Sequence, residues 1–350
     1  MLKMENKKIA IIAGARPNFM KVTPLCRELK KQKMQYFLVN TGQHFSKEMA
    51  TNFLREFKIK ADYNLRPPQQ SVTKQFSGIM IELENIFLKE KPNLVVVAGD
   101  VNSTLAAALT ANKMGIKLVH VEAGLRSYNN KMAEEINRVI IDSLSDILLI
   151  PSEDAIKNLK KEGIVKGINL VGNIMIDTLE MFLPKIKKTK GKFYFCTLHR
   201  AENVDDKDIF TEILDALEII SKDAKIYFPL HPRTKKMAEQ FGLSKKLKNI
   251  FSLLPPLSYQ KSLYYQKNSK LVLTDSGGVQ EETSYLGTPC ITLRTETERP
   301  VTVKLGTNII GGVTKKGILN AYKKTRKTKR KIPLWDGQTA KRIVKIIKNF

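Results

Sequence analysis

Short apolar runs alternate with longer stretches of helical periodicity along the chain, and this alternation constrains the fold more than any other feature of the sequence. In a parallel sheet that is covered by helices on both faces, each strand is buried on both sides and reads as a continuous apolar run. In the first half of the chain we expect strands at residues 8–13, 36–39, 94–98, 117–121, 146–150 and 168–171. A second series is expected at residues 193–197, 225–230, 249–252, 271–274, 290–293 and 308–310. Because the pattern occurs twice, the sequence predicts the α/β class with two Rossmann-like, doubly wound domains.

The length of 350 residues also favours two domains, because a single hydrophobic core usually stops growing at roughly 250 to 300 residues. Residues 181–191 combine Pro, Gly and several lysines, which is typical of a domain boundary. We therefore predict an N-terminal domain over residues 1–180, a C-terminal domain over 181–332, and an amphipathic closing helix within 333–350 that packs back on the N-terminal domain. Ligands of open parallel sheets bind beyond the carboxyl ends of the strands, so we expect the two domains to face each other across a cleft.

The charge of the chain first suggests a nucleic-acid-binding protein. Lys and Arg number 60 against 34 acidic residues, a formal net charge of +26, which is typical of proteins that bind nucleic acid or an anionic membrane. The lysines are nevertheless spread along the chain, apart from one dense run at residues 323–331 after a helix expected at 318–322. Aromatic residues make up only 7% and do not interleave with the basic ones, so the sequence offers no stacking platform for single strands. A solvated basic surface without a nucleic-acid partner is the favoured interpretation, and nucleic-acid binding is the alternative.

Cysteine and histidine usage argues against disulfides and metals. Cys26, Cys196 and Cys290 are an odd number of cysteines without a CxxC spacing, which disfavours a disulfide framework or a structural zinc site. The histidines show no HxxH or HExxH spacing, so no metal is expected. No apolar stretch approaches the ~18 residues of a membrane span, and the run at residues 9–13 is too short for a signal peptide. We therefore expect a cytoplasmic protein that does not associate with membranes.

The first strand-to-helix turn, from Gly14 to Lys21, is suited to an anion. Gly14 permits a tight turn, and the helix that follows would present free N–H groups and the positive end of its dipole, with Arg16 and Lys21 as added charge. The segment matches neither a Walker loop nor GxGxxG, so a plain helix start with two surface cations is an equal alternative.

Carboxylates follow two successive strands and open a nearby helix. Asp100 lies just beyond the strand at 94–98, Glu122 lies just beyond the strand at 117–121, and Glu134 lies where the next helix begins. If these carboxylates share one cleft, their pKa values are pushed apart, as separate acid and base roles require. Taken singly, Asp100 could be a helix N-cap and Glu134 a favourable charge on a helix dipole.

Histidines are concentrated at the same kind of position. All four, His44, His120, His199 and His231, fall at or just after predicted strand ends, whereas core or surface histidines should scatter. Arg200 follows His199 directly. These positions indicate site residues rather than core residues.

The sharpest local signal is the sequence Ser-Gly-Gly at residues 276–278. The strand at 271–274 runs into these residues and then into a helix, an arrangement that lets backbone N–H groups approach a phosphate. Glu282, one turn into the helix, could accept hydrogen bonds from a ribose diol. Arg294 and Arg299 follow the next strand, and their long cationic side chains could extend to the same phosphate. The alternative interpretation of Ser-Gly-Gly is a tight turn with a purely structural role.

Together these segments resemble one known family. In order, the chain carries GARPNFMK (14–21), TGQH (41–44), GDVNST (99–104), HVEAGLRS (120–127), EEINR (134–138), GN (172–173), LHRAEN (198–203), HP (231–232), DSGGVQEE (275–282), LGTP (286–289) and TERP (297–300). Their order and spacing resemble the non-hydrolysing UDP-N-acetylglucosamine 2-epimerases over nearly the whole chain. The resemblance implies the GT-B fold, with two Rossmann-like domains, and a homodimer.

The resemblance further implies an activity and its residues. The activity is the interconversion of UDP-N-acetylglucosamine and UDP-N-acetylmannosamine without a cofactor, feeding surface polysaccharide synthesis. The resemblance implies that UDP is eliminated to leave 2-acetamidoglucal, and is then added back with C2 protonated on the opposite face. By motif matching, the catalytic residues would be Asp100, Glu122, Glu134 and His231. The residues that bind the UDP moiety would be Arg16, Lys21, His199, Arg200, Ser276, Gly277, Gly278, Glu282 and Arg299. An activating second substrate site would include Gln43 and His44.

Two positions depart from the family pattern. Asn18 stands where many members have Glu, and Ala133 stands where a proline commonly precedes the Glu-Glu pair. We expect the nucleotide site to survive both changes and the sugar pocket to differ. Alternative substrates are therefore a UDP-diacetamido-glucuronate or a UDP-linked 6-deoxy sugar, and alternative activities are those of a hydrolysing epimerase or a GT-B glycosyltransferase.

Overall fold

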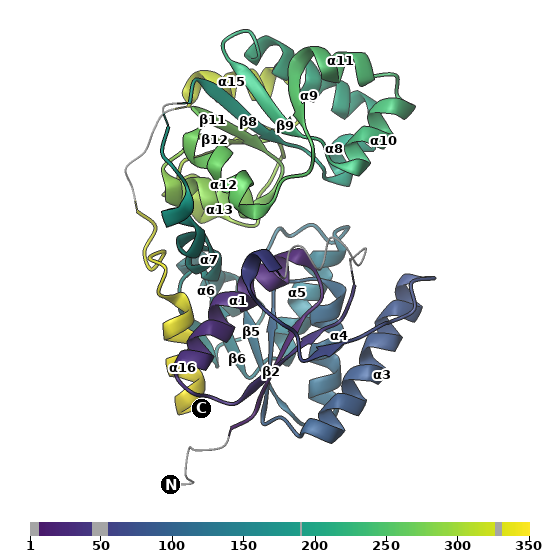
Figure 1. The fold of residues 1–350 in the computed structure, drawn as a ribbon, viewed down its shortest axis with the longest axis vertical. Coiled ribbons are helices and arrows are strands. Elements are labelled where there is room, and N and C mark those ends of the chain that lie inside the picture. Colours follow the sequence, from purple (N-terminus) through teal and green to yellow (C-terminus); the bar gives the residue numbers. More distant parts are fainter. Residues whose placement is uncertain (1–6, 44–54, 190, 326–330) are drawn as a thin grey trace. The chain divides into compact units, whose positions relative to one another are not determined.

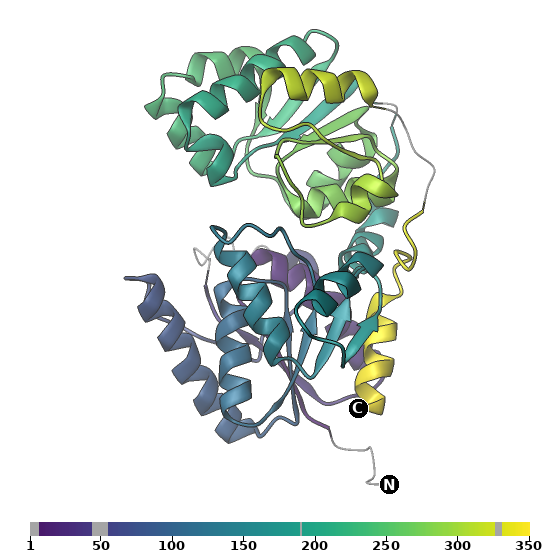
Figure 2. The same ribbon diagram turned by 180° about the vertical axis from the view of Figure 1, so that it is seen from behind.

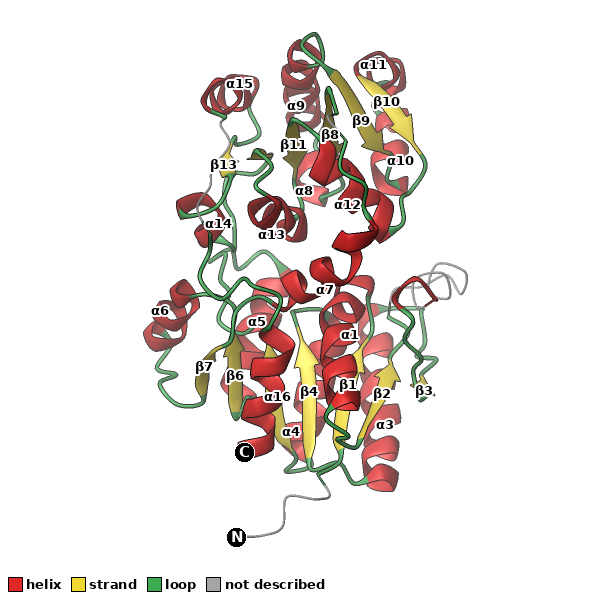
Figure 3. Ribbon diagram, turned by 60° about the vertical axis from the view of Figure 1, so that its left-hand side comes forward, coloured by secondary structure: helices red, strands yellow, loops and turns green. Residues whose placement is uncertain are grey.

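The computed structural model describes residues 7–43, 55–189, 191–325 and 331–350 (Figure 1). The chain divides into two compact units: unit 1 comprises Met1–Thr178 and Pro333–Phe350, and unit 2 comprises Leu179–Ile332. Each unit contains one parallel sheet with helices around it (Figures 1 and 3). The predicted α/β class with two Rossmann-like units is thereby confirmed, and the cleft stays a prediction.

Unit 1 is built on a seven-stranded sheet of order β3-β2-β1-β4-β5-β6-β7. Its strands are β1 (Ile9–Ala13), β2 (Tyr36–Asn40), β3 (Tyr63–Asn64), β4 (Leu94–Ala98), β5 (Lys117–Val121), β6 (Ile147–Ile150) and β7 (Ile168–Leu170). Ile9 in β1 is paired with Tyr36 of β2 on one side and with Leu94 of β4 on the other. The strand order reverses at β1, so the carboxyl ends of β1 and β4 form the switch point at which doubly wound sheets bind ligands.

The helices of unit 1 cover this sheet. They are α1 (Arg16–Lys31), α3 (Val72–Glu90), α4 (Asn102–Lys113), α5 (Ala133–Leu144), α6 (Glu153–Lys161), α16 (Thr339–Asn349) and the first part of α7 (Ile174–Phe182). Helices α3 and α4 lie side by side (Figures 1 and 2). The closing helix α16 packs on α1, and its apolar residues Ile343 and Ile347 are buried. At the first turn of α16, Asp177 of α7 accepts hydrogen bonds from the backbone N–H groups of Thr339 and Ala340, at 3.1 and 2.7 Å.

Unit 2 repeats the plan with a six-stranded sheet of order β10-β9-β8-β11-β12-β13. Its strands are β8 (Phe193–Thr197), β9 (Lys225–Pro229), β10 (Phe251–Leu254), β11 (Leu271–Thr274), β12 (Cys290–Thr292) and β13 (Asn308–Ile310). Its helices are the 3-10 helix η1 (Leu183–Lys185), α8 (Ala201–Val204), α9 (Lys207–Ile220), α10 (Pro232–Gln240), α11 (Ser244–Ile250), α12 (Tyr259–Asn268), α13 (Gly277–Leu286), α14 (Pro300–Lys304) and α15 (Lys315–Lys324). The order again reverses, here at β8, which pairs with β9 on one side and β11 on the other.

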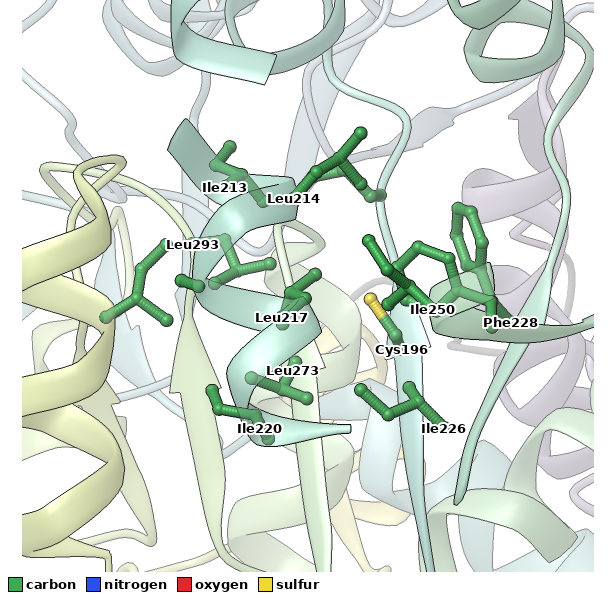
Figure 4. Packing of buried hydrophobic residues seen from close by; sticks show 14 of the residues in the cluster. Cys196, Ile213, Leu214, Leu217, Ile220, Ile226, Phe228, Ile250, Leu273 and Leu293 are labelled. Atoms are coloured by element: carbon green, nitrogen blue, oxygen red, sulfur yellow. The ribbon is translucent and has the colours of Figure 1, made fainter. Parts of the chain in front are cut away.

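Apolar side chains from helices and strands fill the core of each unit. In unit 2, Ile213 and Leu217 of α9 pack over the sheet residues Cys196 and Leu273 (Figure 4). The apolar face of α9 therefore holds the central strands β8 and β11 in place, and with them the turns that follow these strands.

The structure differs from the predicted strands at two places. The strand expected at 249–252 begins at Phe251, because residues 244–250 form α11 and their apolar members belong to that helix. Strand β3 was not expected, since only Tyr63 and Asn64 pair with β2 and two residues carry no readable pattern. Among the described residues, no helix is long and apolar enough to span a membrane.

Candidate functional site

In unit 1, the segments that follow β1, β4 and β5 lie at one edge of the sheet, because these strands are neighbours and parallel (Figure 3). Lys21 belongs to the helix after β1, Asp100 follows β4, and Glu122 follows β5. The predicted carboxylates of the two strand ends and the predicted cation thus belong to the same edge. This edge is the candidate site of unit 1.

Lys21 and Glu122 form an ion pair whose side chains are 8% and 3% exposed. A Cβ atom at Gly99 would lie 2.6 Å from Nζ of Lys21, so the glycine of the GDVNST motif leaves the space that the ammonium group needs. Gly99 also has a φ of +70°, and Glu122 itself has a φ of +73°. A left-handed backbone is uncommon for a residue with a side chain, and such conformations concentrate at functional sites.

Asp100 and Glu134 occupy different environments. Asp100 is not the N-cap of α4, because that helix begins at Asn102 with Val101 as its cap. Its carboxylate instead accepts a hydrogen bond from Nε of Arg138 at 2.9 Å, and 26% of its side chain is exposed. Glu134 lies in the first turn of α5 and is exposed, where its charge is favourable to the helix dipole.

The buried carboxylate of the Glu-Glu pair is Glu135, which sequence reasoning missed. It accepts hydrogen bonds from the backbone N–H groups of Ser127 and Tyr128 and pairs with Arg138. Arg138 therefore links Glu135 to Asp100. Helical periodicity separates the two adjacent glutamates, one facing the protein and one facing solvent.

Asn18, one of the two departures from the family pattern, holds the first turn together. Its side-chain oxygen accepts hydrogen bonds from the N–H groups of Gly14 and Ala15 at 3.3 and 3.0 Å, and its amide donates to the carbonyl of Ala98 at 2.7 Å. An amide can both accept and donate here, whereas an ionised carboxylate can only accept. Arg16, at the first position of α1, is exposed.

The TGQH segment is only partly described. Gln43 is buried, and its side-chain oxygen accepts hydrogen bonds from the backbone N–H and the hydroxyl of Ser103 at 2.7 and 2.6 Å. His44 lies outside the described residues. The contacts of Gln43 thus anchor the segment to the start of α4.

His120 is a core histidine, and its interpretation as a site residue is wrong. The side chain is fully buried within β5, and its ring nitrogens contact Oδ1 of Asp142 at 2.6 Å and the carbonyl of Gly99 at 2.9 Å. Burial acts to raise the pKa of Asp142, but His120 and Arg126 together hold it below its usual value. This buried network fixes the backbone around Gly99.

In unit 2, Asp275 organises the turns after β8 and β11. Its buried carboxylate accepts hydrogen bonds from the backbone N–H groups of His199 and Arg200, both at 2.7 Å, and lies 3.0 Å from Nδ1 of His199. Burial acts to raise the pKa of Asp275, but His199 and these N–H groups hold it below its usual value. Asp275 belongs to the DSGGVQEE motif, and no separate role is predicted for it from the sequence.

His231 caps α10 beside His199. Its Nδ1 accepts a hydrogen bond from the backbone N–H of Arg233 at 3.2 Å, so a neutral ring carries its proton on Nε2. The ring centroids of His199 and His231 are 5.4 Å apart. Partial burial is the largest cause that lowers the pKa of His231, and the charges of His199 and Arg233 lower it further. The charge of Asp275 acts in the opposite direction, but the net shift is downward and favours the neutral ring.

The Ser-Gly-Gly turn opens α13 with its N-terminus uncapped by a side chain. Ser276 is the N-cap and makes no capping hydrogen bond. A Cβ atom at Gly277 would lie 2.5 Å from Nη1 of Arg299, whereas a Cβ at Gly278 would meet nothing within 4 Å. The free N–H groups and the Arg299 guanidinium therefore lie together, which suits an anion. Glu282 is buried further along the helix and accepts a hydrogen bond from Nε2 of Gln266 at 2.7 Å.

A buried charge cluster supports Arg299 and was not predicted. Glu298, with a fully buried side chain, contacts Arg294 at 2.9 Å, Arg299 at 3.5 Å and Arg200 at 3.9 Å. Burial acts to raise the pKa of Glu298, but these guanidinium groups, Arg299 foremost, hold it far below its usual range. Arg294 was expected to reach toward a ligand, and that expectation is wrong: it is 1% exposed and bound to Glu298 and Glu202.

Comparison with known proteins agrees with these arrangements. The family model described as UDP-N-acetylglucosamine 2-epimerase matches residues 27–348. A Methanococcus maripaludis protein named UDP-N-acetylglucosamine 2-epimerase is 42% identical, over 97% of this chain and 98% of its own. A Pseudomonas aeruginosa protein named UDP-2,3-diacetamido-2,3-dideoxy-D-glucuronate 2-epimerase is 40% identical, over 90% of this chain and 91% of its own.

The similarity extends to solved structures. The crystal structure of the Methanocaldococcus jannaschii UDP-GlcNAc 2-epimerase in complex with UDP-GlcNAc and UDP matches with a TM-score of 0.88 at 39% identity, covering 98% of this chain and all of that one. With a family model over most of the chain and relatives above 40% identity over nearly all of it, the chain belongs to the UDP-N-acetylglucosamine 2-epimerase family.

Proposed function

We propose that the protein interconverts UDP-N-acetylglucosamine and UDP-N-acetylmannosamine as a non-hydrolysing 2-epimerase. The observation that carries the proposal is the similarity, over 98% of the chain, to an enzyme solved with UDP-GlcNAc and UDP. The charged groups of the two units support it, because one provides carboxylates at strand ends and the other provides an anion site.

The proposed reaction begins by elimination. A base removes the C2 proton, its electron pair forms the C1–C2 double bond, and the C1–oxygen bond breaks so that UDP leaves. In the return step an oxygen of UDP attacks C1 while an acid delivers a proton to the opposite face of C2. The proton and the UDP are both returned and no electrons are exchanged, so the reaction needs no redox cofactor.

Unit 2 supplies the groups that bind the leaving UDP. The diphosphate would be held by the N–H groups of Gly277 and Gly278 and by the guanidinium of Arg299. Negative charge develops on the diphosphate as UDP leaves, and stabilising such charge is usually the largest contribution to catalysis. His199 and Arg200, whose backbone N–H groups are held by Asp275, would add side-chain hydrogen-bond donors. A neutral His231 would offer its Nε2–H to the reacting group or to a phosphate oxygen. Glu282 would contact the ribose and Ser276 the phosphates, and Arg16 of unit 1 would be a further phosphate contact.

Unit 1 supplies the acid–base groups. Glu122 would act beside Lys21, with which it forms a buried ion pair, and Lys21 would also face the diphosphate. Asp100 is held by Arg138 and is partly exposed, so it is oriented and accessible to a substrate. Glu134 would reach the sugar from the first turn of α5.

The experiment that tests the proposal is incubation with UDP-N-acetylglucosamine in D2O, with C2 and the products followed by NMR. Deuterium at C2 of an intact UDP-sugar supports it, whereas free UDP with free sugar indicates hydrolysis. A parallel incubation uses UDP-2,3-diacetamido-2,3-dideoxy-D-glucuronate, because a relative named for that substrate is 40% identical. Turnover of the second substrate alone would replace the first proposal with this one, and turnover of neither would reject both.

The same proposal includes a cytoplasmic homodimer. Three free cysteines, all buried, suit a reducing compartment. Ile81 and Leu88 lie two turns apart on one face of α3 and are each 60% exposed, so this face is the candidate subunit contact. Sedimentation equilibrium tests the dimer, and Ile81→Lys with Leu88→Lys should yield monomers. The product would feed glycosyl transfer into surface polysaccharides.

A further inference from the structure

A hollow of about 850 Å³ lies in unit 1, away from the strand ends that hold the candidate site. It is lined by α1, by the segment that leads into β2 and by residues 58–62, which lead into β3 (Figure 3 shows these elements). Lys8, just before β1, and Tyr36, the first residue of β2, line it, so the hollow lies toward the amino ends of these strands. Its size falls within the roughly 300 to 1,000 Å³ of small-ligand sites.

The lining is far more basic than the chain as a whole. Six of its fourteen residues are Lys or Arg, against 60 of 350 in the sequence, and Asp62 is the one acidic member. Asp62 is already engaged, since its carboxylate accepts a hydrogen bond from the backbone N–H of Leu38 at 2.8 Å. The fraction of cationic residues around this hollow therefore exceeds the fraction in the chain as a whole.

Four of these cations have no ion-pair partner among the residues that the structure describes. Lys8 pairs with Glu90, and Arg27 donates to the carbonyl of Phe57 at 3.2 Å. The other four lining cations form no ion pair with any residue of the described ranges; they are Lys30, Lys33, Lys58 and Lys60. Like charges around one concavity repel each other and raise the local concentration of anions.

We propose that this hollow binds a small anion that carries several linked phosphate groups. Four unpaired ammonium groups match a ligand of three or four negative charges, and lysine binds phosphate as a compact point charge. The half-buried Tyr36 adds an aromatic surface that a nucleoside base could contact. The ligand class is thus inorganic polyphosphate or a nucleoside triphosphate, at a site separate from the anion site of unit 2.

The test measures binding of inorganic tripolyphosphate and, separately, of adenosine triphosphate by calorimetry. Combined Lys30→Gln, Lys33→Gln and Lys58→Gln substitutions should weaken binding about tenfold, or about 1.4 kcal/mol, since each exposed ion pair contributes roughly a factor of two. Equal affinity for the two ligands supports recognition of the phosphates alone, and tighter binding of adenosine triphosphate supports an added contact with the base.

A matched control removes three exposed charges from α15 of unit 2, by Lys316→Gln, Lys323→Gln and Lys324→Gln. This control variant should bind as the wild-type protein does. If it weakens binding as much as the hollow variant, the attraction comes from net charge and the proposal is wrong. Absence of binding, no effect of the hollow variant, or displacement of tripolyphosphate by UDP would equally overturn it. The last result would place the ion in unit 2.

Discussion

Substitution of Gly277 by Ala tests whether this glycine exists to make room for Arg299. The new Cβ would lie 2.5 Å from Nη1, 2.9 Å from Cζ and 3.3 Å from Nε of Arg299, all closer than ordinary contact. The guanidinium must therefore move, and Nε must lose or lengthen its 2.6 Å hydrogen bond to Glu281, whose side chain is 1% exposed.

The magnitude follows from that hydrogen bond. A hydrogen bond to a charged group contributes about 1.5 to 3 kcal/mol, so Gly277→Ala should destabilise unit 2 by about 2 kcal/mol. For a unit of this size that corresponds to a fall of roughly 4 to 8 °C in melting temperature, which calorimetry resolves. Gly278→Ala is the control: its Cβ would meet nothing within 4 Å, so the melting temperature should stay or rise slightly because Ala favours a helix.

A double-mutant cycle decides the cause. In an Arg299→Ala background the Cβ of residue 277 no longer meets a guanidinium, so Gly277→Ala should cost nothing further. Additive losses of stability would refute the reasoning, because they would show that Gly277→Ala acts through the helix backbone and not through Arg299.

Three further predictions concern the charged groups. Glu122→Gln should abolish turnover while UDP affinity, measured by calorimetry, stays within about tenfold, and a parallel loss of UDP binding would contradict an acid–base role. Gly99→Ala should cost about 1 to 2 kcal/mol from the left-handed backbone in addition to the displacement of Lys21, and in a Lys21→Met background only the backbone part should remain in the unfolding free energy. Because the folded pKa of Glu298 is depressed, its contribution to stability is complete above the unfolded pKa of about 4.3 and is lost as the pH falls. The stability gap between wild type and Glu298→Gln should therefore be about 2 kcal/mol smaller at pH 3 than at pH 7, and a constant gap in the thermal unfolding series would exclude this linkage.

The strands were predictable because burial on both faces leaves a continuous apolar run. The run LVVVA, at Leu94–Ala98, is such a segment, and it forms β4 with every residue buried. An apolar run does not locate a strand where the run is shared between two elements, as at α11 and β10, or where the strand has only two residues, as in β3. A strand can therefore be predicted from its apolar run only when the run is several residues long and belongs to that strand alone.

The predicted site positions were reliable for backbone turns and less so for individual side chains. Strand ends placed Asp100 and Glu122 at one edge, as parallel pairing requires. The same rule included His120, but that residue is inside β5 and faces the core, so nearness to a strand end does not decide where a side chain points. Two partners of Glu298, Arg294 and Arg299, are close to it in sequence, but Arg200 comes from the distant turn after β8, and no local pattern reports such a pairing.

The two units use one structural device to position a cation. In unit 1 Lys21 approaches the main chain at Gly99, and in unit 2 Arg299 approaches it at Gly277. Each cation also pairs with a buried carboxylate, Glu122 or Glu281, so its position is set from two sides. Gly99 needs to be glycine both for its φ of +70° and for space, whereas Gly277 needs it for space alone, since its φ is not positive. A glycine beside a strand end can therefore mark the place where a charged side chain from a neighbouring segment approaches the main chain. The sequence motif shows the glycine, but it does not show which residue approaches.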